Sequence, residues 1–163
     1  SIYNYFQTKE EIFLALLQRE HEAWSADLDA IAQRDAPQSA AEFADALAHT
    51  LEKRSCMLKL MSMNLYDMEV NSRLENLVGF KRSYAGALQA VTCCLENAFP
   101  SLTAHQIQDF LYAFFPFLFG VYPYTSHTDK QLEAMKLAHV EYTHYSIYEL
   151  IKSFVMNMLR AFL

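Results

Sequence analysis

Hydrophobic residues recur every three to four positions along almost the whole chain, and this spacing predicts consecutive α-helices without strands. The first helix is expected from Thr8 to Ala32, because Thr8 and Glu11 have the spacing of a capping box. The apolar positions expected on its inner face are Ile12, Leu16, Leu17, Trp24, Leu28 and Ile31. A second helix should begin after Ser39, and the segment CMLKLMSMNLYDM is typical of a third.

The second half of the chain continues the same pattern with longer helices. These are expected at Arg73–Ala98, Ala104–Val121 and Asp129–Phe162, the last with a break near Glu141. The longest uncharged run, Phe110 to Thr128, is interrupted by prolines, and its strongly apolar part is too short to favour a membrane span. The predicted fold class is therefore all-α, a multi-helix bundle.

Composition and charge narrow the class of protein. The 163 residues suit one domain, and a hydrophobic content of 53% with 14% aromatics is ample for a core. A net charge of −6 argues against a nucleic-acid surface on this part of the molecule. The chain has three cysteines, Cys56, Cys93 and Cys94, and this odd number shows no disulfide framework. Their absence from disulfides favours a reducing compartment and a cytoplasmic location.

The opening segment, SIYNYFQTKEEIF, places aromatic residues directly before a strong helix start. Because the first residue is not methionine, we expect the chain to be a fragment of a longer protein. The segment resembles the helix-turn-helix exit of the TetR family of bacterial transcriptional regulators. The matching residues are Ser1, Ile2, Tyr3, Asn4, Tyr5, Phe6, Lys9, Glu10, Glu11, Ile12 and Phe13, with Tyr5 where the family often has histidine.

This resemblance implies a division of the chain into two parts. Residues 1–7 would be the remnant of the DNA-binding domain, and residues 8–163 the effector-binding and dimerisation domain. In the full-length protein, Ser1, Tyr3, Asn4 and Tyr5 would lie on the recognition helix in the major groove, and Lys9 would meet a phosphate. Without the missing helices, this chain alone should not bind operator DNA specifically.

Three features of the sequence point to a pocket for a lipophilic small-molecule effector. Methionines cluster between Met57 and Met68, Lys81 interrupts an apolar stripe, and the aromatic run around Pro116 would free a backbone carbonyl. Ordinary core filling explains the methionines equally well, and Lys81 could simply extend to the surface. The residues expected in the pocket are Met57, Met61, Leu65, Lys81, Tyr84, Leu88, Phe114, Phe117 and Tyr122.

The apolar residues of the last long helices exceed what one core-facing stripe requires. We therefore expect a homodimer in which Ala104–Val121 and Tyr145–Phe162 form a four-helix interface, the arrangement that the resemblance also implies. The expected interface residues are Phe110, Leu118, Ile147, Ile151, Phe154, Val155 and Met158.

Gly79 and Gly86 share one face of the helix expected at Arg73–Ala98, which favours close helix packing or, alternatively, room for a ligand.

No nucleophile motif, phosphate loop or metal motif is visible, so neither catalysis nor a cofactor or metal is expected. A redox role for Cys93 and Cys94 stays open beside the simpler interpretation of a structural thiol. The leading hypothesis is the sensing and dimerising part of a TetR-like repressor. The alternatives are a stand-alone helical protein that carries a lipophilic molecule and a helical interaction module without a ligand.

Overall fold

The structure, a computed structural model, describes residues 5–163, so Ser1, Tyr3 and Asn4 lie outside the described residues. Within this range the chain is helical, as predicted, and contains no strand. The helices are α1 Lys9–Ala32, α2 Ala40–Glu52, α3 Ser55–Ser62, α4 Leu65–Val70, α5 Leu74–Ala98, α6 Ala104–Thr125, α7 Asp129–Leu137 and α8 Ile147–Arg160.

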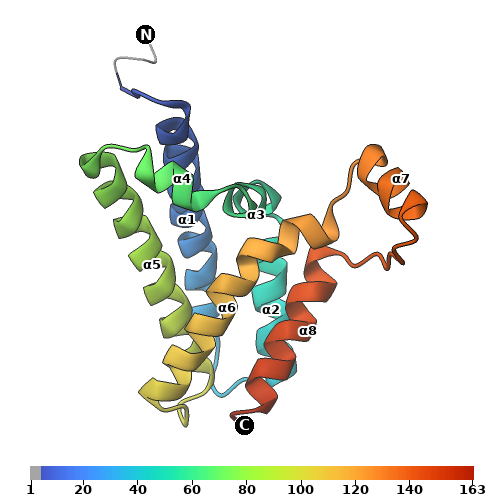
Figure 1. Cartoon of the computed structure of the whole chain (residues 1–163). Helices are drawn as coiled ribbons and strands as arrows, with labels where there is room; N and C mark the ends of the chain where they lie inside the picture. The colour runs from blue at the N-terminus through green and yellow to red at the C-terminus, as the bar shows by residue number, and fades with distance from the viewer. Residues whose placement is uncertain (1–4) are drawn as a thin grey trace.

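The helices form two main pairs joined by a crossing helix (Figure 1). The most extensive packing is between α1 and α5, and the next most extensive is between α2 and α8. Helix α6 links the pairs, because it contacts α3, α5 and α8. Helix α7 stands out from the body, and none of its residues is buried (Figure 1).

Aromatic residues fill the centre of this arrangement. Trp24, Phe110, Phe114 and Phe115 are almost wholly buried, with neighbouring ring centroids 5.3–6.5 Å apart. The Trp24 indole N–H donates to the Thr50 hydroxyl at 3.0 Å, so this large side chain is buried without an unpaired donor. The body therefore has one continuous core.

Local capping explains most helix boundaries and the main departures from prediction. The expected third helix is split, because the Asn64 side chain accepts from the Asp67 backbone N–H and starts α4 separately from α3. The predicted break near Glu141 is confirmed, since Ser146 and Glu149 form a capping box that starts α8. Helix α6 runs through two prolines to Thr125, beyond the predicted end at Val121.

Two expectations about helix faces are wrong. Leu16 is 42% exposed and does not belong to the inner face of α1, whereas Leu17 is wholly buried. Gly79 does lie close to α1, since an added Cβ would sit 3.3 Å from the Gln18 side chain. Gly86 has no such neighbour within 4 Å, so close packing does not explain it.

Among the described helices, none is both long and apolar enough to cross a membrane.

Candidate functional site

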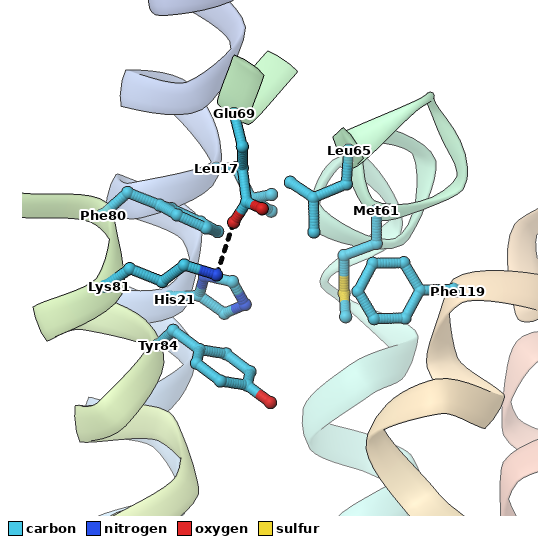
Figure 2. A pocket seen from close by; sticks show the side chains of 9 residues that line it. All are labelled: Leu17, His21, Met61, Leu65, Glu69, Phe80, Lys81, Tyr84 and Phe119. Carbon is cyan, nitrogen blue, oxygen red and sulfur yellow. Dashed lines mark ion pairs between the residues drawn. The ribbon is translucent and has the colours of Figure 1, made fainter. Parts of the chain in front are cut away.

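A cavity of about 140 Å³ lies where five helices meet (Figure 2). Its walls come from α1, α3, α4, α5 and α6, which are brought together by the packing of α1 on α5 and of α3 on α6. The lining residues are Leu17, His21, Met61, Leu65, Glu69, Phe80, Lys81, Tyr84 and Phe119. Most of this surface is apolar, as is usual for small-molecule sites.

His21 is the polar group deepest in this lining. Its side chain is only 2% exposed, and neither ring nitrogen has a hydrogen-bond partner among the described residues. The rings of Phe80 and Tyr84 lie 5.6 and 6.1 Å from it, centroid to centroid. Burial lowers the His21 pKa to about 4, so the imidazole is neutral at pH 7. An unpaired buried group of this kind costs about 1–3 kcal/mol, which points to a partner that binds there.

An ion pair stands beside the cavity. Glu69 of α4 and Lys81 of α5 approach to 2.5 Å between carboxylate oxygen and ammonium nitrogen (Figure 2). The Lys81 ammonium also lies 5.8 Å from the ring centroids of both Phe80 and Tyr84. Burial raises the pKa of the Tyr84 hydroxyl, although the Lys81 charge opposes this. The pair is half exposed at Lys81, so it marks the side of the cavity that faces solvent.

Four of the nine residues expected in the pocket line this cavity: Met61, Leu65, Lys81 and Tyr84. The other five lie elsewhere. Met57 and Phe114 are fully buried in the core, and Leu88 packs against that core. Phe117 stacks on Phe154 with centroids 4.0 Å apart, and Tyr122 lies under the Lys59 ammonium at 5.9 Å.

Sequence reasoning missed Leu17, His21, Glu69, Phe80 and Phe119. Leu17 and Phe80 had a visible signal, because both fall on apolar helix faces. His21 also had a signal, because it falls at helical spacing between Leu17 and Trp24 on the buried face of α1. Glu69 gave none, since a lone acidic residue on a short helix is ordinary. Because Leu17 lines the cavity, substituting it should alter ligand affinity directly.

A second group of contacts ties the start of α1 to the start of α5. Both Glu11 carboxylate oxygens accept from Arg73, whose backbone N–H and guanidinium donate at 2.8–3.2 Å. Arg73 also donates to the Tyr5 carbonyl, and the Thr8 hydroxyl donates to the Asn71 carbonyl. These hydrogen bonds hold the pKa of the buried Glu11 at about 2, against 4.5 ordinarily. We call this group the Glu11–Arg73 clamp.

The expected capping box at the start of α1 is only half formed. Thr8 accepts from the Glu11 backbone N–H, but the Glu11 carboxylate reaches the backbone N–H of Gln7 rather than that of Thr8. Of the residues expected to touch DNA, the structure describes Tyr5 and Lys9, and both side chains are exposed.

The expected dimer residues divide into two groups. Phe110, Leu118, Ile151 and Val155 are wholly buried within the single chain, so they build its core and offer no surface to a second copy. Ile147, Phe154 and Met158 are half-buried on α8, and Phe154 stacks on Phe117 of α6. An interface through these helices would therefore use the second group only.

The remaining polar chemistry is sparse. Among residues 5–163, no three His, Cys, Asp or Glu side chains gather as they would around a metal ion. Cys94 is buried, donates to the Leu28 carbonyl and has its pKa raised to about 12, mainly by burial, whereas Cys93 is exposed. A thiol that is so rarely ionised is a poor redox sensor.

Comparison with known proteins identifies a family. A family model described as "Tetracyclin repressor-like, C-terminal domain" matches residues 18–160. A comparison with curated proteins gives no significant match. The family match begins after the helix-turn-helix exit, so it is independent of the opening segment SIYNYFQTKEEIF.

Proposed function

Given that this chain belongs to the family of tetracycline repressor-like C-terminal domains, we propose that it is the effector-sensing and dimerising part of a DNA-binding transcriptional regulator. The regulator would work as a cytoplasmic homodimer and, most simply, as a repressor. The observation that carries the sensing role is the mostly apolar cavity with the unpaired His21 in its wall. This site is suited to a small, largely apolar effector.

The position of the cavity supports a route from effector to DNA. Glu69 lies beside the cavity on α4, and Asn71 and Arg73, which contact the start of α1, follow it within four residues. A displacement of α4 would therefore reach the clamp, and through it the segment that leads to the DNA-reading helices. An effector alters operator affinity only if it binds the two arrangements of this segment unequally.

The size of this cavity argues against its use in the rival function, that of a stand-alone carrier of lipophilic molecules. Drug-sized ligands occupy pockets of roughly 300–1,000 Å³. A cavity of about 140 Å³ is too small for a long acyl chain. A regulator needs only a site whose occupancy changes the position of its walls.

The test uses the full-length protein, including the residues upstream of Ser1. Operator affinity should be measured with and without candidate effectors for the wild type and for Leu17→Ala, which shortens a lining side chain and enlarges the cavity. We expect effector to change wild-type operator affinity, and Leu17→Ala to shift the effector concentration required by roughly tenfold, equivalent to about 1.4 kcal/mol. Val70→Ala, at a 63% exposed position outside the cavity, is the control and should match the wild type. An upstream sequence without DNA-binding helices would refute the proposal.

A further inference from the structure

The polar groups of the cavity define what kind of ligand it accepts. The His21 ring projects from α1 toward the space bounded by Met61 and Phe119 (Figure 2). Its two nitrogens have no partner among residues 5–163, although the side chain is 98% removed from solvent. A neutral imidazole carries one donor and one acceptor, so the complementary group is a hydroxyl, which can accept or donate.

The charges beside the cavity exclude an ionic ligand. Glu69 and Lys81 neutralise one another at 2.5 Å, and the remaining lining residues carry no charge when His21 is neutral. An anion would have to break this pair to reach Lys81, and it would then leave the half-buried Glu69 without a counter-ion. The ligand is therefore expected to be uncharged.

The volume and walls of the cavity limit the ligand to one ring. An engineered protein cavity of about 150 Å³ binds benzene, and this cavity has a similar volume of about 140 Å³. Phe80, Tyr84 and Phe119 offer aromatic faces and edges, and Met61 offers a polarizable sulfur. The aromatic side chains and the sulfur both favour an aromatic ligand ring over a saturated one.

We infer that the effector is a small, neutral aromatic alcohol of the phenol class, whose ring fills this cavity and whose hydroxyl hydrogen-bonds to His21. This inference rests on the proposed effector-binding function and narrows it to a ligand class. It also assigns His21 as the residue that determines specificity.

The first test compares three probes on the 163-residue chain by NMR titration: phenol, toluene and benzoate. Phenol and toluene have nearly the same shape but differ in the hydroxyl, while benzoate adds a charge. We expect phenol to bind roughly tenfold more tightly than toluene, and benzoate more weakly than either. Equal affinity for phenol and toluene, or preference for benzoate, would overturn the inference.

The second test removes the hydrogen-bonding group. In His21→Leu, phenol should lose its advantage over toluene, while toluene still binds; His105→Leu, at an 81% exposed histidine, is the matched control. In the wild type, phenol should shift the ring-nitrogen resonances of His21 but not those of the other five histidines. This readout needs no variant, and unchanged His21 resonances at saturating phenol would contradict the inference.

The outcomes for ligand class and for regulator function are separable. If phenol binds through His21 but leaves operator affinity of the full-length protein unchanged, the ligand assignment stands and the proposed function fails. If an acyl or anionic compound alters operator affinity and no phenol binds, the proposed function stands and the ligand assignment fails.

Discussion

At the scale of single residues, His21 differs from the rest of the described core. Fully buried polar groups elsewhere in the core have partners, as the Trp24 indole has in Thr50 and the Cys94 thiol has in the Leu28 carbonyl. His21 is equally buried but has none within residues 5–163. Buried atoms that also lack a partner belong to side chains that are themselves partly exposed, such as those of Gln38, Asn76 and His127. A group retained at a cost to stability is expected where function requires it.

Replacing His21 with leucine should stabilise the ligand-free chain. The substitution removes two unpaired nitrogens, so we expect the free energy of unfolding at pH 7 to rise by about 1–2 kcal/mol. Urea unfolding followed by circular dichroism measures this change. His105→Leu, at an exposed site, should leave the free energy within about 0.5 kcal/mol of the wild type. A clear loss of stability in His21→Leu would mean that the imidazole has a partner.

The pH dependence of stability supplies an independent check on His21. Its pKa is about 4 in the folded chain against 6.5 ordinarily, so the unfolded chain binds more protons between these values. Stability should therefore be full above pH 6.5 and fall as the pH drops toward 4, by up to about 3 kcal/mol. The His21→Leu variant should lack this decline. Urea unfolding at pH 7, 6, 5 and 4 compares the two, and equal slopes would contradict burial of a neutral imidazole.

At the scale of elements, the short helix α4 joins two sites that the sequence separates. It carries Glu69 at the cavity, and its C-terminal cap, Asn71, accepts from Thr8 just before α1. Arg73, the residue directly before α5, then binds Glu11 on α1. Helices α1 and α5 pack side by side over much of their length (Figure 1). At the end near Glu11, the hydrogen bonds of the clamp add to this packing.

Arg73→Gln should uncouple sensing from DNA binding. The clamp lies outside the cavity, so ligand affinity should be unchanged, while the effector-induced change in operator affinity of the full-length protein should shrink. Lys53→Gln, which loses only a surface pair with Asp27, is the control. If Arg73→Gln keeps the full effector response, the clamp does not transmit the signal.

The same substitution should alter acid stability. The Glu11 pKa is depressed to about 2, so its charge stabilises the fold above pH 4.5, and this contribution is lost as the pH falls toward 2. Arg73→Gln should cost about 2 kcal/mol at pH 7, because the buried carboxylate loses charged hydrogen bonds. Its unfolding free energy should then decline less between pH 4.5 and 2 than that of the wild type. This range lies below most of the His21 transition, so urea unfolding can distinguish the two groups.

At the scale of the whole molecule, α6 and α8 leave a partly apolar face on the outside. The stacked pair Phe117 and Phe154 is half-buried at their junction, and Ile147 and Met158 are also half-buried on α8. Gly120, one turn beyond Pro116 on α6, is exposed, and an added Cβ there would meet nothing within 4 Å. A helical glycine costs about 1 kcal/mol against alanine, and the single chain gives no reason for it. Close approach of a second copy would supply one.

Gly120→Arg should therefore convert the proposed dimer into a monomer. Light scattering at micromolar concentration should give a dimer for the wild type and a monomer for the variant. Gly86→Arg is a matched control, because it has the same open space around the added Cβ but lies on α5, outside the face formed by α6 and α8. It should remain dimeric, and both variants should keep the helical circular dichroism signal. A monomeric wild type would refute dimerisation, and a dimeric Gly120→Arg would exclude this face of α6.

The sequence by itself determined the helices and the family. Helix starts depend on side chains a few residues apart, such as Ser39 with Glu42 and Ser146 with Glu149, so local patterns identify them. The resemblance of the first thirteen residues predicted the family that the match over residues 18–160 then supported independently. Where a local signal was weak, as at Asn64, the prediction missed the boundary between two helices.

Only the tertiary structure decided which apolar faces meet and which leave a space. Phe110, Leu118, Ile151 and Val155 follow the same periodicity whether they face a partner copy or their own core, and packing assigned them to the core. The cavity depends on how the helices pack in space. The packing of α5 on α1 brings Phe80 to His21 from a distant part of the chain, and the turn between α4 and α5 brings Lys81 to Glu69. Burial, and not residue type, left His21 neutral and unpaired, because the same imidazole on a surface would be hydrated.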